Sequence, residues 1–210
     1  MLNFYEKLSK IKNSKDKDII KLKYLEKPTS LQIVDFSDET IHLLTKWRKE
    51  NWDGFNSKFN PTNDSTKQWL KKTIDSKQRL LFLIIYDGKK IGHTGMVFLD
   101  EKNDDTIWME NIVKGEPSVA PGVMGFIEKF FLKWIFDEFN VSWVKGYVFS
   151  DNARTIRLHE KCGWLTLDSI PLKREFSKDG WAWVKTNLSS PEEYAERYFL
   201  LMGKENKDKR

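Results

Sequence analysis

Residues 152–164 read Asn-Ala-Arg-Thr-Ile-Arg-Leu-His-Glu-Lys-Cys-Gly-Trp, and this stretch decides the fold of the chain. The run before it, 141–149, is rich in β-branched and aromatic residues, which favours a strand. Asn152 is typical of a helix N-cap, because its side-chain oxygen can accept a hydrogen bond from a free backbone N–H. Gly163 is typical of a helix stop. The stretch therefore predicts a strand that leads into a short helix.

Composition predicts one domain with extensions. The chain has 210 residues, of which 40% are hydrophobic and 14% aromatic, enough to bury one substantial core. The 36 basic and 31 acidic residues are spread along the chain, so the net charge of +5 does not require nucleic acid as a partner. We expect an N-terminal extension over 1–27, a main domain over 28–202 and a charged tail over 203–210.

Cysteine content and hydropathy indicate the cellular compartment in which the protein is expected. The single cysteine, Cys162, excludes an internal disulfide and fits a reducing compartment. No run approaches the roughly 18 to 20 apolar residues that span a bilayer, and the start of the chain lacks an apolar signal core. The three histidines lie too far apart for a local metal motif. We expect a cytoplasmic protein with no membrane partner and no metal.

Hydrophobic periodicity predicts the order of the remaining elements. The first segment shows helical spacing at 4–11 and a strand at 20–24. The main domain begins with a strand at 31–36, a helix capped by Ser37, a second helix from about 64, a hairpin of 80–86 and 90–99, and a strand at 106–113. A central helix at 122–139 comes next, and the chain ends with a closing hairpin of 165–176 and 181–186 and a terminal helix at 191–202. This mixture predicts an α/β (α+β) fold. We expect a mostly antiparallel sheet of about seven strands, flanked by helices, with one parallel strand pair.

The segment from Thr106 to Trp164 resembles the GNAT superfamily of acyl-CoA-dependent N-acyltransferases, and the resemblance covers roughly residues 30–186. Its most specific part is the late helix, which is similar to the family pattern Asn-x-x-Ala/Ser-x-x-Leu-Tyr-x-Lys-x-Gly-Phe. The matching positions are Asn152, Thr155, Leu158, His159, Lys161, Gly163 and Trp164. The resemblance implies a GNAT-like fold, acetyl-CoA as co-substrate, and a splayed parallel strand pair that binds it.

Two residues are candidates for proton transfer. The resemblance places His159 where many members carry the tyrosine that hands a proton to the departing thiolate, and an imidazolium is a competent acid. Glu110, which we expect on the same strand face as Ile112, is the candidate base, because an aliphatic amine is mostly protonated at neutral pH. The alternatives are that His159 only packs beside Ile156 and that Glu110 is a salt-bridge partner. Cys162, beside a helix stop, is expected to pack and not to act as a nucleophile.

The resemblance also implies the cofactor-binding residues. The family's phosphate loop, Gln/Arg-x-x-Gly-x-Gly/Ala, corresponds to 119–124, which reads Val-Ala-Pro-Gly-Val-Met and keeps one glycine. A helix N-terminus there favours anionic oxygens, although a simple Pro-Gly helix start is the alternative. The backbone of the strand before the loop pairs with pantetheine in the family. The implied residues are Ile112, Val113, Lys114, Pro121, Gly122, Val123, Met124 and Asn152, the last with a plain helix cap as its alternative.

The acceptor is expected to contact aromatic and basic side chains. The candidates are Trp47, Arg48, Trp52, Phe55 and His93. The aromatic side chains among them can stack on a sugar or a nucleobase, or they can simply belong to the core. The run 110–115, Glu-Asn-Ile-Val-Lys-Gly, is similar to GNAT members that acetylate amino sugars in bacterial surface-polysaccharide pathways, often on a nucleotide carrier.

The leading hypothesis is acetyl transfer from acetyl-CoA to a nucleotide-linked amino sugar by direct attack. Acetylation of a protein N-terminus, a small amine or an antibiotic is the alternative within the same class. A non-catalytic acyl-CoA-binding module is the alternative of another class. We expect no nucleic-acid partner, and a homodimer stays open.

Overall fold

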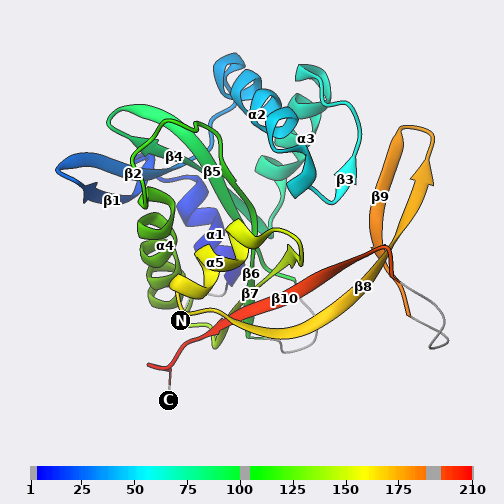
Figure 1. The fold of residues 1–210 in the computed structure, drawn as a ribbon. Helices are drawn as coiled ribbons and strands as arrows, with labels where there is room; N and C mark the ends of the chain where they lie inside the picture. Colours follow the sequence, from blue (N-terminus) through cyan, green and yellow to red (C-terminus); the bar gives the residue numbers. More distant parts are fainter. Residues whose placement is uncertain (1–3, 100–104, 188–194, 210) are drawn as a thin grey trace.

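A ten-stranded sheet organises the residues that the computed structural model describes, which are 4–99, 105–187 and 195–209. The strand order is β1-β2-β4-β5-β6-β7-β10-β8-β9-β3 (Figure 1). The strands are β1 (Asp18–Tyr24), β2 (Lys27–Ile33), β3 (Ser57–Lys58), β4 (Arg79–Tyr86), β5 (Lys89–Val97), β6 (Thr106–Lys114), β7 (Trp143–Phe149), β8 (Leu165–Ser177), β9 (Gly180–Lys185) and β10 (Arg197–Glu205). The helices are α1 (Phe4–Lys12), α2 (Asp38–Glu50), α3 (Asn63–Asp75), α4 (Val123–Phe139) and α5 (Ala153–Lys161), with the 3-10 helix η1 (Trp52–Gly54).

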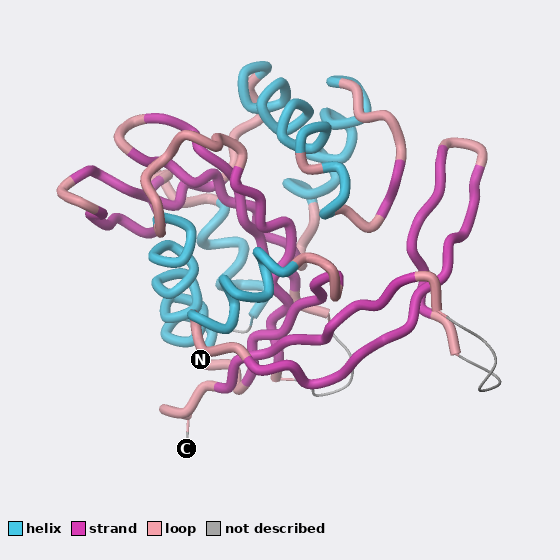
Figure 2. Tube along the Cα trace, viewed as in Figure 1, coloured by secondary structure: helices cyan, strands magenta, loops and turns pink. Residues whose placement is uncertain are grey.

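Helices cover both faces of the sheet (Figure 2). Strand β4 shows how the faces are divided: Phe82 and Ile84 pack with α1 and α4, whereas Leu81 and Leu83 pack with α2 and α3. This division follows from the alternation of side chains along a strand. No helix within the described ranges is long and apolar enough to cross a membrane. The expected mixed fold with flanking helices is confirmed.

Strands β6 and β7 form the parallel pair, and they separate partway along. Their pairing, in a region that is described throughout, ends at Trp108 and Lys145 after three residue pairs. Beyond that point β6 stays paired with β5 as far as Lys114 on its other side. The splayed parallel pair is thereby confirmed, and one edge of β6 is left without a strand partner.

The end of the chain differs from the expectation. The helix expected over 191–202 is wrong where the structure describes it, because 197–205 form β10; residues 191–194 lie outside the described residues. Strand β10 lies between β7 and β8 and hydrogen-bonds both of them. Pairing on two sides outweighs the local helical spacing, which is a weak determinant by comparison. This strand, together with β1 and the two-residue β3, raises the strand count above the expected seven.

Residues 4–24 contribute to the main core. Leu8 of α1 is buried in the cluster that also holds Phe131 of α4. Strand β1 pairs with β2 along its length. At the end of β1, Tyr24 Oη donates a hydrogen bond of 2.5 Å to the carbonyl oxygen of Pro121. The N-terminal segment therefore touches the loop that precedes α4.

Candidate active site

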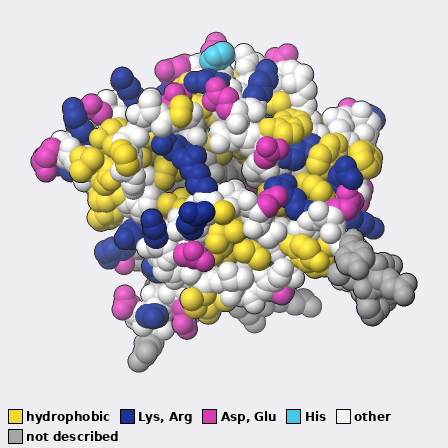
Figure 3. Space-filling model, in the orientation of Figure 1, with side chains coloured by type: hydrophobic (Ala, Val, Ile, Leu, Met, Phe, Trp, Pro, Cys, Tyr) yellow, Lys and Arg dark blue, Asp and Glu magenta, His cyan; other side chains and the backbone are white. Residues whose placement is uncertain are grey.

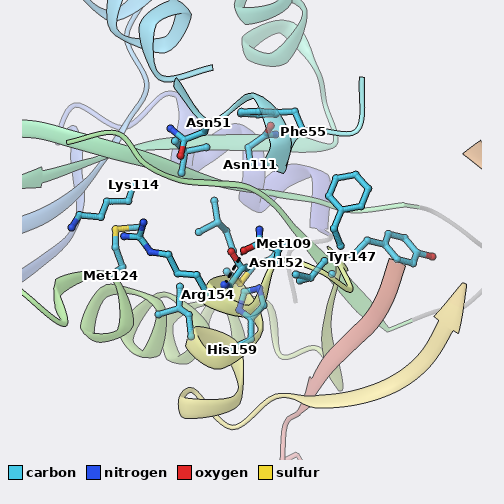
Figure 4. Close-up of a pocket in the computed structure, with 18 of the residues that line it drawn as sticks. Asn51, Phe55, Met109, Asn111, Lys114, Met124, Tyr147, Asn152, Arg154 and His159 are labelled. Atoms are coloured by element: carbon cyan, nitrogen blue, oxygen red, sulfur yellow. Dashed lines mark hydrogen bonds between the residues drawn. The ribbon is translucent and has the colours of Figure 1, made fainter. Parts of the chain in front are cut away.

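A large cleft lies where β6 and β7 diverge. Its volume is about 1690 Å³, and residues 109–114 of β6 and 146–149 of β7 line it from two sides. Figure 4 shows Asn152, Arg154 and His159 on one side of it and Asn51 and Phe55 on the other. Single small-ligand pockets usually measure about 300 to 1000 Å³. The cleft therefore has room for two ligands at once.

The start of α4 lies at one end of this cleft. Gly122 is the N-cap of α4, has φ +83°, and makes no side-chain cap hydrogen bond. This backbone conformation favours glycine, and a Cβ there would lie 2.7 Å from Tyr24 Oη. Val123 and Met124 line the cleft, while Pro121 lies just beside it. The free amides of the first helical turn can hold anionic oxygens.

Basic side chains gather at the same end. Figure 3 shows lysine and arginine side chains beside a hollow in this face of the molecule. The cations that line this end are Lys114, Lys129, Arg154, Arg157 and Lys161. Burial lowers the pKa of Lys114, whose Nζ donates to the carbonyl oxygen of Pro117 at 3.0 Å. An anionic ligand is favoured here. Apart from Lys114, the site prediction did not include these cations, although their spacing along α5 indicates one basic helix face.

Helix α5 and its N-cap position two polar residues of the late motif, Asn152 and His159. Asn152 Oδ1 accepts a hydrogen bond of 3.1 Å from the backbone N–H of Thr155, so the expected cap is confirmed. His159 is buried, and its Nδ1 lies 2.7 Å from Oε1 of Glu128 on α4. Its ring stacks on Trp164 with the ring centres 4.5 Å apart. Both Asn152 and His159 line the cleft, and the ring of His159 is held from two sides.

Cys162 is a packing residue. Burial, followed by the neighbouring Glu128 carboxylate, raises the pKa of its thiol to about 12. Its Sγ points to the carbonyl oxygen of Gly125 at 3.6 Å. A thiol that stays protonated at neutral pH is a poor nucleophile. The expectation that Cys162 packs is confirmed, and a covalent thiol intermediate finds no support.

Glu110 lines the cleft as part of an ion pair. Both of its carboxylate oxygens lie 2.6 Å from Nη1 of Arg79 on β4. Burial raises the pKa of Glu110, and the charge of Arg79 works against that rise. The expectation that Glu110 shares a strand face with Ile112 is wrong, because Asn111 has φ +56° at a bulge that reverses the alternation. Ile112 packs towards α4, and Val113 packs towards α2 and α3.

The predicted acceptor residues divide into two groups. Arg48, Trp52 and Phe55 line the cleft. Trp47 is fully buried in the cluster of α2 and α3, and its Nε1 donates to Oε1 of Glu116 at 3.0 Å. His93 is buried beneath a smaller cavity of about 180 Å³, and burial lowers its pKa to about 4. Trp47 and His93 are therefore core residues, which is the alternative given for them above, because both side chains lie on the inward face of their elements.

Cations stacked on aromatic rings line the other end of the cleft, and we call this group the acceptor wall. Its pairs are Arg48 over Phe55, Lys58 over Trp52 and Trp181, and Arg197 over Phe149 and Trp183. Arg48 also lies over Phe59, which lines the smaller cavity. Arg197 lies 3.5 Å from the ring centre of Phe149. Burial lowers the pKa of Arg48 to about 10, so it remains charged at neutral pH. The wall offers positive charge and flat apolar surface together.

The C-terminal members of the acceptor wall could not be predicted from a local sequence pattern. Trp181 and Trp183 lie on β9, which reaches the cleft because β3 pairs with it through Ser57 and Lys58. Arg197 begins β10 and pairs with Asp151 at 2.7 Å. These contacts join segments more than 40 residues apart in sequence. The acceptor end is therefore a product of the topology.

The sequence and the structure were compared with those of known proteins. A family model described as "Acetyltransferase (GNAT) domain" matches residues 31–164. No curated protein matches the sequence. Similar solved structures include a ribosomal-protein-S5-alanine acetyltransferase from Vibrio fischeri, which has 12% identity and a TM-score of 0.62 and is matched over 91% of this chain and 99% of its own.

Two further solved structures are similar. An aminoglycoside acetyltransferase in complex with coenzyme A has 14% identity and a TM-score of 0.60, over 84% of this chain and 94% of its own. A spermidine N-acetyltransferase from Vibrio cholerae has 13% identity and a TM-score of 0.59, over 84% of this chain and 93% of its own. At such low identities these similarities show the fold alone.

Proposed function

The chain belongs to the GNAT acetyltransferase family, and from this premise we propose that it transfers an acetyl group from acetyl-CoA to a primary amine by direct attack. The observation that carries the proposal is the cleft between β6 and β7, whose pairing ends at Trp108 and Lys145. An unpaired strand edge offers N–H and C=O groups to an extended ligand. The pantetheine arm of acetyl-CoA is such a ligand.

The donor end of the cleft suits acetyl-CoA. Residues 109–114 of β6 can pair with the pantetheine arm through their backbone. The start of α4 at Gly122 and the cations of α5 suit the phosphates. A backbone N–H of Ile112 or Val113 directed at the thioester carbonyl would stabilise the developing oxyanion, an effect of roughly 3 to 4 kcal/mol per donor in comparable sites.

Two groups can carry the protons of this reaction. Glu110 takes a proton from the bound ammonium, directly or through water, and the free amine attacks the thioester carbon. His159 takes the second proton from the nitrogen of the tetrahedral adduct, the C–S bond breaks with its electron pair on sulfur, and His159 returns that proton to the CoA thiolate. Both residues line the cleft, which supports these roles. The buried thiol of Cys162 is not needed.

For the acceptor we propose a nucleotide-linked amino sugar. The acceptor wall supports an anionic substrate with an aromatic or sugar ring, because its three cations each stack on aromatic rings. Besides Glu110, four acids of the described residues line the cleft, Glu50, Asp53, Asp151 and Glu196, of which Asp151 pairs with Arg197 and Glu196 pairs with Arg174. The names of the similar structures mention a ribosomal protein, an aminoglycoside and spermidine. Aminoglycosides and spermidine are polycations, whereas a nucleotide-linked amino sugar carries negatively charged phosphates.

The test is to incubate the protein with acetyl-CoA and single acceptors while free thiol is followed. The panel contains amino sugars linked to nucleotides, the same amino sugars without nucleotide, peptides with a free N-terminus, aminoglycosides and spermidine. We expect thiol release that depends on the nucleotide-linked amino sugar. Release with another acceptor class would refute the proposed substrate. Binding of acetyl-CoA by thermal shift with no release from any acceptor would favour a non-catalytic binding module.

A further inference from the structure

We propose that Glu128 is a positioning residue that holds the ring of His159 as the proton carrier of the cleft. The inference rests on the proposed function, because it concerns how the CoA thiolate receives its proton. Glu128 lies on α4 and His159 on α5, and their side chains meet at 2.7 Å between Oε1 and Nδ1. Each side chain is 3% exposed, so the pair is enclosed by protein.

The surroundings of Glu128 make its presence costly without a role. Its neighbours on the buried face of α4 include Ile127, Phe131 and Leu132. Its second oxygen, Oε2, is buried and has no hydrogen-bond partner among the described residues. A buried carboxylate is unfavourable unless it is paired and hydrogen-bonded. The other ion-paired acid of this helix, Asp137, is exposed and pairs with Lys133.

The contact determines which nitrogen of His159 is available. An ionised carboxylate can only accept hydrogen bonds, so Nδ1 carries the hydrogen that Glu128 accepts. The lone pair of the neutral ring then lies on Nε2, and His159 lines the cleft. The stacking on Trp164 prevents the ring from turning away. Glu128 thereby fixes both the tautomer and the direction of the ring.

This arrangement allows His159 to both take and give the proton. When the amine nitrogen bonds to the thioester carbon, it carries a positive charge in the tetrahedral adduct. Nε2 takes one proton from that nitrogen, and the ring becomes an imidazolium whose charge is balanced by Glu128. The C–S bond breaks with its electron pair on sulfur, and Nε2 returns the proton to the thiolate. No external oxidant, reductant or metal is required, and the protons balance.

The kinetic test compares Glu128→Gln with Glu128→Asp and with Glu160→Gln, which removes an exposed carboxylate next to His159 in sequence. We expect Glu128→Gln to lower kcat by roughly 10²- to 10⁴-fold, as loss of an orienting carboxylate can do. The KM and Kd for acetyl-CoA should change less than about twofold, because Glu128 does not line the cleft. Glu128→Asp should recover part of kcat, and Glu160→Gln should match the parent. An unchanged kcat in Glu128→Gln would overturn the inference.

A spectroscopic test does not depend on turnover. The chain has three histidines, so nitrogen NMR of protein labelled at histidine gives few signals, and the His159→Gln variant assigns one pair to His159. In the parent, we expect the Nδ1–H tautomer for His159 and its loss or exchange broadening in Glu128→Gln. An Nε2–H tautomer in the parent would overturn the inference even if the protein is active. Conversely, a parent with the expected tautomer but no thiol release from any acceptor would refute the proposed function instead.

Discussion

Nη1 of Arg79 lies 2.6 Å from both carboxylate oxygens of Glu110. This ion pair connects β4 with β6 across the strand that lies between them, β5. Glu110 is mostly buried, with 21% of its side chain exposed. Burial raises the pKa of Glu110, and the charge and hydrogen bonds of Arg79 limit that rise. The pair sets the protonation of a side chain that lines the cleft.

The first prediction concerns Glu110 as base. Glu110→Gln keeps the size of the side chain but cannot accept the proton of the bound ammonium. We expect kcat to fall by roughly 10²- to 10⁴-fold, with little change in the Kd for acetyl-CoA. Steady-state thiol release and calorimetric titration measure the two quantities. Glu50→Gln, which removes another carboxylate that lines the cleft, is the control and should keep most activity. Equal turnover of Glu110→Gln and the parent would exclude Glu110 as the base.

The second prediction follows from the charge of Arg79. Since Arg79 lowers the pKa of Glu110 against the effect of burial, Arg79→Met should raise that pKa further. A base must be deprotonated to act, so the acidic limb of the profile of kcat/KM against pH should move to higher pH. The measurement is kcat/KM for the acceptor across the acidic and neutral range, together with a check of folding by circular dichroism. A limb that stays in place, or moves to lower pH, contradicts the assignment.

The third prediction concerns the corner at the start of α4. Gly122 has φ +83°, and a Cβ would come within 2.7 Å of Tyr24 Oη. Left-handed backbone costs a residue with a Cβ about 1 to 2 kcal/mol, so Gly122→Ala should either lower the melting temperature by a few degrees or shift the loop. A shifted loop would weaken acetyl-CoA binding by about tenfold, which is about 1.4 kcal/mol. Gly54→Ala, where nothing lies within 4 Å of the new Cβ, is the matched control. A Gly122→Ala variant that equals the parent in both measurements would contradict the role of this corner.

Local signals explain which parts of the fold could be predicted. The cap at Asn152, the stop at Gly163 with φ +86°, and the hairpin turn at Asp87 and Gly88 each depend on residues a few positions apart. Such signals act before any tertiary contact forms. They placed the late helix, the hairpin of β4 and β5, and the strands around the cleft.

Long-range pairing explains what the sequence did not reveal. Strand β10 is a strand because β7 and β8 bond it on both sides. The bulge at Asn111, a non-glycine residue with positive φ, reverses the faces of Glu110 and Ile112 without a local sequence signal. Glu128 reads as one more polar residue of an amphipathic helix until α5 brings His159 to it. The partners of the site residues, more than the residues themselves, required the structure.

The last prediction tests the acceptor wall through Arg48. Arg48→Met keeps the apolar stem beside Phe55 and Phe59 but removes the positive charge that stacks on their rings. If the acceptor is anionic, its KM should rise by roughly tenfold, a loss typical of one charge-assisted contact, while the Kd for acetyl-CoA stays the same. Lys49→Met removes an exposed cation from the next position of α2 and should leave the KM unchanged. Raising the salt concentration should weaken acceptor binding less in Arg48→Met than in the parent, because the variant has one charge fewer to screen. A KM for a nucleotide-linked amino sugar that is equal in the parent and in Arg48→Met would show that Arg48 does not recognise the acceptor.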